Sequence, residues 1–197
     1  MIMLALILSL LGVEPKVTES YRGILNRKAP SLEVSEWIQL PKGKTTLDIS
    51  DFKGKVVYLF CFQSWCPGCH NHGFPTLLRV MHHYKDDPNV VFLAVQTSFE
   101  GFSYNSFEQA KAVIKQYGLR IPVGQSGTRT KASKLMRNYR TGGTPWTVII
   151  DKTGVVRFND FYLNPDQAVQ IIDVLKSQPV TRTSHVRVAE PAAAVAH

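Results

Sequence analysis

The feature that most constrains this chain is a run of apolar residues that leads into two closely spaced cysteines. The segment KVVYLFCF (55–62) is continuous, apolar and rich in β-branched and aromatic side chains, which is typical of a strand buried on both faces of a sheet. Cys66 and Cys69 follow it within the sequence Trp-Cys-Pro-Gly-Cys-His. Pro67 suits the first turn of a helix, where a backbone N–H has no partner. We therefore expect a strand, a turn and a helix, with Cys66 at the helix N-terminus.

A Cys-x-x-Cys pair at the start of a helix can act as a redox dithiol. The partial positive charge of the helix N-terminus favours thiolate over thiol, so we expect a lowered pKa for Cys66. Cys69 lies one helical turn further on and can attack a mixed disulfide that Cys66 has formed. The chain has three cysteines, too few for a disulfide framework in a protein of this length. We interpret the third, Cys61, as a buried core thiol.

The rest of the chain alternates between strand and helix patterns. Strands are expected at 90–95, 121–123, 144–151 and 155–162, and helices after Cys66 and at 106–118, 130–139 and 164–177. Pro75 should kink or divide the first of these helices. The alternating segment within 30–47, with PKGK as a turn, predicts a hairpin or edge strands. Together these patterns predict an α/β fold in which helices flank a mixed sheet.

Two distant motifs carry a resemblance to a known family. SWCPGC after GKVVYLFCF, together with GGTPW (142–146) before the last two strands, resembles the thioredoxin superfamily. TlpA-like and ResA-like thiol–disulfide oxidoreductases are the branch that is most similar. These proteins add an N-terminal β-hairpin and a helical insertion before a cis-proline. The resemblance covers about residues 28–177, which we expect to form the thioredoxin-like domain.

The resemblance implies a site and a reaction. Cys66 would attack a disulfide and Cys69 would resolve the intermediate, without a metal or organic cofactor. The substrate would be a disulfide or dithiol in another protein, an upstream redox partner would be needed, and the protein would act as a monomer. Pro145 would be the cis-proline. The implied substrate-binding residues are Trp65, Pro67, Gly68, Thr144 and Pro145.

Some residues depart from the family pattern. Many thioredoxins carry a buried acid six residues before the first active-site cysteine, and Phe60 stands there. His70 follows the second cysteine where the family usually has Lys or Arg. We interpret His70 as a solvated helix histidine, although a protonated His70 near the thiolate would also stabilise it. The other histidines of this region, His72, His82 and His83, are expected at the surface.

Other chemistries use the same spacing. Cys66, Cys69 and His70 match the attachment sequence of a c-type haem, but that interpretation explains neither the buried strand nor GGTPW. Zinc would need four ligands from two pairs, and the chain has one cysteine pair. A peroxiredoxin-like thiol peroxidase would share the core, but Gln63 stands where that class has Thr or Ser. A thioredoxin-like binding or chaperone domain without turnover is the non-enzymatic alternative.

The net charge of the chain bears on its possible partners, and the composition of its N-terminal segment bears on its location in the cell. The net charge is +8, yet the sequence shows no zinc-finger pairs or RNP-like motif, so we expect no nucleic-acid partner. Lys131, Lys134 and Arg137 share a helical face that is either solvated or docks an acidic partner.

The apolar run at 2–13 is an export signal, an uncleaved membrane anchor or a helix packed on the body. We therefore expect an N-terminal segment and linker (1–27) and a flexible tail (178–197). The cell envelope or periplasm is preferred over the cytoplasm.

Overall fold

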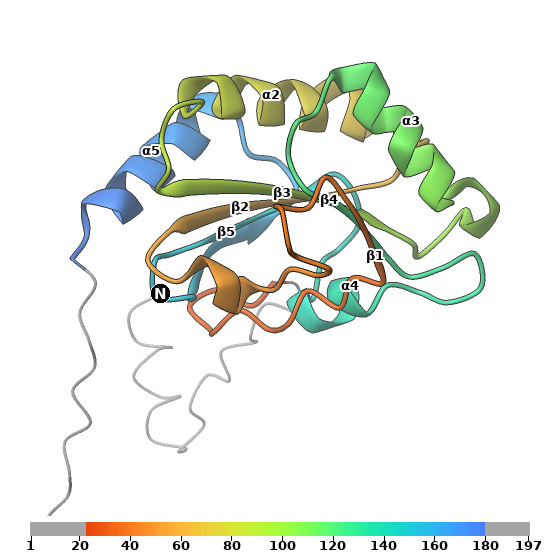
Figure 1. The fold of residues 1–197 in the computed structure, drawn as a ribbon, viewed down its shortest axis with the longest axis horizontal. Coiled ribbons are helices and arrows are strands. Elements are labelled where there is room, and N and C mark those ends of the chain that lie inside the picture. Colours follow the sequence, from red (N-terminus) through yellow and green to blue (C-terminus); the bar gives the residue numbers. More distant parts are fainter. Residues whose placement is uncertain (1–22, 180–197) are drawn as a thin grey trace, which may run out of the picture.

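A mixed sheet of six strands in the order β1-β4-β3-β2-β5-β6 organises the protein. The computed structural model describes residues 23–179, and Figure 1 shows their arrangement. The predicted apolar segment at the N-terminus and the predicted tail fall largely outside these residues. The strands are β1 Glu36–Ile38, β2 Val56–Phe62, β3 Val90–Thr97, β4 Val123–Ser126, β5 Trp146–Ile150 and β6 Val156–Asp160; the α-helices are α2 Phe74–His83, α3 Phe107–Tyr117, α4 Lys134–Tyr139 and α5 Pro165–Ser177.

Helices cover both faces of this sheet. Helices α2, α3 and α5 lie on one face, and α4 lies on the other face together with a short 3-10 helix, Ile49–Phe52 (Figure 1). Strand β2 is fully buried because its side chains point alternately into two cores. Tyr58 and Phe60 enter the core under α2, whereas Leu59 and Cys61 enter the core that contains α4. The predicted α/β class, with a mixed sheet flanked by helices, is confirmed.

Strand pairing brings distant segments to the end of β2. Strand β3 runs parallel to β2, and β5 runs antiparallel to it with Trp146 opposite Cys61. The residues immediately before Trp146 therefore lie beside the residues that follow Phe62. In this way the sheet places the Thr-Pro sequence next to the Cys-x-x-Cys turn.

Local sequence signals fix several helix ends. Ser106 caps α3 by accepting a hydrogen bond from the backbone N–H of Gln109, whose side chain binds the N–H of Ser106 in return. Gly118 ends that helix in a left-handed conformation. Asn164 caps α5 by accepting a hydrogen bond from the backbone N–H of Gln167. Pro75 divides the active-site helix as expected: a π-helical turn, Cys69–Gly73, precedes α2, and Pro75 lies in the first turn of α2.

The N-terminal part of the domain differs from the prediction. In place of a hairpin, residues 30–47 contribute one edge strand, β1, which pairs antiparallel with β4. The PKGK turn forms, with Lys44 N–H bonded to Pro41 O at 3.0 Å, but no second strand follows it. Residues 45–52 instead lead into the 3-10 helix, which Asp48 caps. The prediction of an added N-terminal hairpin is therefore wrong, whereas the prediction of an edge strand is confirmed.

Two further elements begin later than predicted. Strand β4 starts at Val123 rather than at 121, and α4 starts at Lys134 rather than at 130. The residues before α4 form a turn, closed by a hydrogen bond from Thr128 N–H to Lys131 O at 2.8 Å. Ser133 then caps α4 through the N–H of Met136. None of the helices between residues 23 and 179 has the length and the apolar composition of a membrane-spanning helix.

Candidate active site

The two cysteines of the Cys-x-x-Cys motif occupy different environments. After β2 ends, a turn bonds Cys66 N–H to Gln63 O at 3.1 Å. Cys69 N–H then points at Cys66 Sγ over 3.4 Å, as expected at the start of a helix. Cys66 is 8% exposed and Cys69 is completely buried. Both cysteines are free thiols, so an outside sulfur can reach Cys66 only.

The electrostatic environment also separates the two thiols. The pKa of Cys66 is lowered to about 5, and the Cys69 thiol is the largest cause. The Thr144 hydroxyl and the backbone N–H groups of Cys69 and Gly68 also lower it, although burial opposes the shift. Burial raises the pKa of Cys69 well above its usual range, and the neighbouring Cys66 raises it further. One sulfur is thus a thiolate at neutral pH and the other a thiol.

The Thr144-Pro145 segment lies directly on the dithiol. The peptide bond between these residues is cis, as the resemblance implied. The Cys66 thiol contacts Thr144 O at 3.4 Å. Pro145 packs against the helix start so closely that a methyl group on Gly68 would lie 3.1 Å from the proline ring. The structure therefore brings the predicted residues Cys66, Gly68, Thr144 and Pro145 together.

Trp65 borders the same site. Its side chain is 40% exposed, and its ring packs on Gly101. A Cβ on Gly101 would lie 2.9 Å from the ring, and the backbone of this glycine is left-handed, so the packing requires glycine. Pro67 is exposed beside Cys66. All the residues predicted to bind substrate therefore surround the more accessible cysteine.

Gln63 is part of the site, although its sequence position gave no sign of this. It is 1% exposed, and its amide joins two loops. Nε2 donates to Glu100 O at 3.1 Å, and Oε1 accepts from the Thr144 hydroxyl at 3.1 Å. A sequence pattern could have indicated only that a polar residue interrupts the apolar run just before the cysteines.

His70 is not the solvated helix histidine that we predicted. Its ring is half-buried, with Nε2 2.7 Å from Ser64 O and Nδ1 2.6 Å from the Tyr117 hydroxyl. Because Ser64 O can only accept, Nε2 carries a proton. The ring also stacks on Tyr117. His70 thus ties the active-site turn to α3. In contrast, His72, His82 and His83 are exposed, as predicted.

Two other sequence-based interpretations concern strand β2. Phe60, at the position where many thioredoxins have an acid, packs on Phe62 and Phe74 within the core. Cys61 is completely buried on the opposite face of the sheet from Cys69. Burial raises the pKa of Cys61 to about 12, which agrees with the prediction of a buried core thiol.

Residues 23–179 contain no cluster of three or more His, Cys, Asp or Glu side chains suited to a metal ion.

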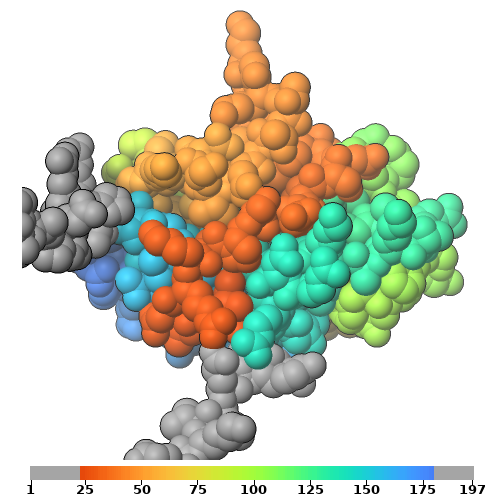
Figure 2. Space-filling view, turned by 90° about the horizontal axis from the view of Figure 1, so that it is seen from below, coloured from red at the N-terminus to blue at the C-terminus, as the bar shows by residue number. Residues whose placement is uncertain are grey.

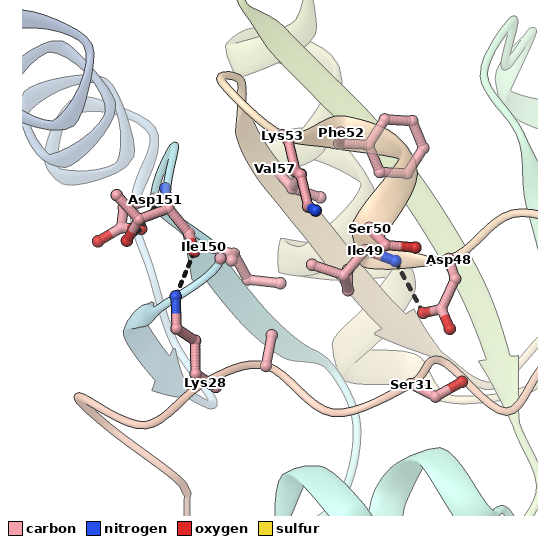
Figure 3. A pocket seen from close by; sticks show the side chains of 13 residues that line it. Lys28, Ser31, Asp48, Ile49, Ser50, Phe52, Lys53, Val57, Ile150 and Asp151 are labelled. Atoms are coloured by element: carbon pink, nitrogen blue, oxygen red, sulfur yellow. Dashed lines mark hydrogen bonds between the residues drawn. The ribbon is translucent and has the colours of Figure 1, made fainter. Parts of the chain in front are cut away.

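Two hollows of the described surface lie away from the dithiol. A cavity of about 290 Å³ sits between Lys28, Ile49 and Ile150 (Figure 3). A second hollow of about 790 Å³ is lined by Phe52, Lys55 and residues at the start of β3. Both lie near the beginning of β2, whereas the cysteines follow its end. Beside Pro145 the hollow measures only about 20 Å³, so the dithiol faces a shallow surface.

Comparisons with known proteins agree with this geometry. A model of the family described as Redoxin matches residues 25–169. The thiol-disulfide oxidoreductase ResA of Bacillus anthracis is 27% identical over 132 residues, which cover 67% of this chain and 66% of ResA. The chain thus spans just under two thirds of that relative. The ResA of Bacillus subtilis is 27% identical over 110 residues, covering 56% of this chain and 55% of ResA.

Solved structures show the same architecture. A crystal structure described as a thioredoxin-like superfamily protein matches with a TM-score of 0.68 and 29% identity, covering 77% of this chain and 97% of the other. A thiol-disulfide isomerase from Corynebacterium glutamicum matches with a TM-score of 0.66 and 29% identity, covering 77% and 98%. With its thioredoxin-like fold and its similarity to ResA, the chain belongs to the Redoxin family.

Proposed function

We propose that this protein is a thiol–disulfide oxidoreductase that exchanges disulfides with another protein through Cys66 and Cys69. The observation that carries the proposal is the asymmetry of the two thiols beneath the Thr144-Pro145 segment. Cys66 is the more accessible and has a pKa of about 5, whereas Cys69 is buried with a raised pKa. The first fits an attacking thiolate, and the second fits a resolving thiol.

The reaction then proceeds in two exchanges. The Cys66 thiolate attacks one sulfur of the partner's disulfide, that S–S bond breaks, and a mixed disulfide forms. The partner's released thiolate takes up a proton. Cys69 loses its proton and attacks Cys66 Sγ, which forms the Cys66–Cys69 disulfide and releases the second partner thiol. Two electrons pass from the dithiol to the partner, and the reverse sequence oxidises a partner dithiol.

The surroundings of Cys66 fit a polypeptide substrate. Trp65, Pro67 and Gly68 are next to Cys66 in the chain, and Thr144 O lies 3.4 Å from its sulfur, with Pro145 directly after it. The hollow beside Pro145 is too small to enclose a drug-sized ligand, whereas an extended chain can lie across a shallow surface and bond to the exposed backbone. An upstream dithiol or disulfide partner must restore the starting redox state. We expect no metal or organic cofactor in this exchange.

His70 argues against the haem and zinc alternatives. An axial haem ligand or a zinc ligand must present an imidazole nitrogen lone pair to the metal. Nε2 is protonated toward Ser64 O, and Nδ1 is bonded to the Tyr117 hydroxyl. Binding a metal through either nitrogen of His70 would therefore require the hydrogen bond of that nitrogen to break.

Trapping the mixed disulfide tests the proposal. With Cys69→Ala, we expect a stable covalent adduct between Cys66 and a disulfide-containing substrate peptide, detected by intact mass. Cys66→Ala should form no adduct. Cys61→Ala is the matched control, because Cys61 is buried on the other face of the sheet, and it should turn over normally. Adducts on Cys66→Ala would contradict the assignment, and rapid consumption of hydrogen peroxide would favour a thiol peroxidase.

A further inference from the structure

The positive charge of this protein is concentrated in one part of its sequence. Residues 109–150 contain no Asp or Glu, although the whole chain has 15 acidic residues. The same stretch contains eight basic residues, which equals the net charge of +8 for the entire chain. They are Lys111, Lys115, Arg120, Arg129, Lys131, Lys134, Arg137 and Arg140. The excess charge is thus a local feature rather than a property of the whole surface.

Five of these residues form what we term the α4 basic strip: Arg129, Lys131, Lys134, Arg137 and Arg140. Their side chains are exposed, apart from the half-buried Arg140. Lys134 has an acidic neighbour, Glu33, at 3.5 Å. Within residues 23–179, no carboxylate pairs with the other four. A cluster of unpaired cations produces a positive potential that extends beyond contact distance.

The strip is attached next to the dithiol. Arg140 precedes Thr144 by four residues, a span of at most about 14 Å even for a fully extended chain, and Thr144 O contacts Cys66 Sγ. Within the strip, Ser133 N–H bonds at 2.6 Å to the O of Ser98, the residue that follows β3. Figure 2 shows residues near 125–140 (teal) at the surface beside the first segment of the described chain (red and orange). A partner that reaches Cys66 would therefore lie within the positive electrostatic potential that the strip produces.

We propose that the α4 basic strip docks an acidic segment of the protein whose disulfide or dithiol reacts at Cys66. This inference rests on the proposed function and names the charge of its substrate. The strip fits a protein better than a membrane, because none of the exposed large apolar side chains between residues 23 and 179 lies on α4 or its preceding turn. Surface helices that bind membranes insert such side chains. The strip also lacks the exposed aromatic rings on which nucleic-acid bases stack.

Two disulfide-bonded peptides of identical core sequence test the proposal, one flanked by four Glu residues and one by four Lys residues. The wild type should reduce the acidic peptide with a kcat/KM about tenfold or more above that of the basic peptide at low salt. Raising the ionic strength to about 0.5 M should remove most of the difference. Both peptides are assayed with the full chain.

Charge reversal locates the effect. The triple variant Arg129→Glu, Lys131→Glu, Arg137→Glu should lose the preference for the acidic peptide. Its matched control is Lys42→Glu, Lys53→Glu, Lys55→Glu, which changes the net charge equally at exposed positions near the start of β2. This control should keep the preference. A preference that survives in the strip variant, or that disappears in both variants, would overturn the proposal.

Two further measurements separate this proposal from the proposed function. Reduction of the small neutral hydroxyethyl disulfide should be equal in the wild type and both variants. If no protein reduces it, the proposed function fails; if all reduce it but no peptide preference exists, only the docking proposal fails. Strip-dependent binding to phosphatidylserine vesicles or to duplex DNA, without any effect on the peptides, would also overturn the docking proposal.

Discussion

The pKa of a single sulfur, Cys66, determines what the site can do near neutral pH. The largest cause of its low pKa is the hydrogen bond from the Cys69 thiol, and the Thr144 hydroxyl and two backbone N–H groups add to it. An ordinary thiol in the same position would be mostly protonated at pH 7. The thiolate form of this cysteine therefore depends on its neighbour in the motif as well as on the backbone N–H groups at the helix start.

The first prediction concerns the rate at which iodoacetamide alkylates Cys66. In the reduced protein the rate should rise with pH around a midpoint near 5, the pKa of Cys66. In Cys69→Ala the midpoint should move upward, because the variant lacks the strongest hydrogen bond to the thiolate. Cys66→Ala serves as the control for reaction at other cysteines. A midpoint near pH 9 in the wild type would show that the thiolate is not stabilised.

The second prediction concerns Gln63, which we infer competes with Cys66 for one proton. The Thr144 hydroxyl has a single hydrogen and donates it to Gln63 Oε1, yet the same hydroxyl can stabilise the Cys66 thiolate. Gln63→Met removes the acceptor at similar volume. We expect the pKa of Cys66 to fall further in this variant, measured by thiolate absorbance near 240 nm.

A double-mutant cycle distinguishes this competition from a general loss of structure. In a Thr144→Val background, Gln63→Met should leave the pKa of Cys66 unchanged, because the shared hydroxyl is gone. An equal shift in both backgrounds would mean that Gln63 acts by another route, for example through its bond to Glu100 O.

At the scale of elements, the site depends on how closely the active-site helix approaches β2 and the cis-proline. Gly73 lies at the end of the π-helical turn. A Cβ at this position would lie 2.5 Å from the Phe60 ring and 2.9 Å from the Pro145 side chain. The helix, the strand and the proline segment are therefore in contact at a single glycine.

The third prediction follows from this contact. Gly73→Ala should reduce the free energy of unfolding by about 1–3 kcal/mol, the usual cost of overpacking a core, and should also slow disulfide exchange because Pro145 is displaced. Chemical denaturation and the peptide assay measure the two effects. Asn71→Ala, at an exposed position of the same turn, should change neither. Unchanged stability in Gly73→Ala would show that the helix can move away without cost.

Particular residues show which elements the sequence could predict. Strand β2 and helix α3 carry local signals, namely a continuous apolar run and a Ser106–Gln109 capping box. Strand β1 has three residues and exists because β4 pairs with it, so a local pattern could not separate it from a hairpin. The role of Gln63 depends on Thr144, 81 positions away. Contacts of this kind arise only after folding.

At the scale of the whole molecule, the dithiol couples redox state to stability. Cys66 has a native pKa of about 5 against an ordinary value of 9.0. A lowered native pKa stabilises the folded protein fully above the unfolded value, and the contribution is lost as pH falls through the native value. The Cys66–Cys69 disulfide has no proton to titrate at these sulfurs. The reduced protein should therefore gain stability relative to the oxidised protein as pH rises from about 5 to about 9.

The last prediction is that the thermal midpoints of the two forms depend differently on pH. From pH 5 to pH 8, the Tm of the reduced protein should rise relative to that of the oxidised protein, as measured by scanning calorimetry. Above pH 9 the gain should stop, because Cys66 is then ionised in the unfolded chain as well, and the raised pKa of Cys69 should begin to reduce it. A Cys66→Ala, Cys69→Ala variant should show no change with added reductant. Parallel curves for the two forms would contradict the thiolate assignment. A rise of the predicted sign would instead mean that the ionised Cys66 stabilises the folded dithiol near neutral pH, and this contribution makes the pair more oxidising than one with an unshifted thiol.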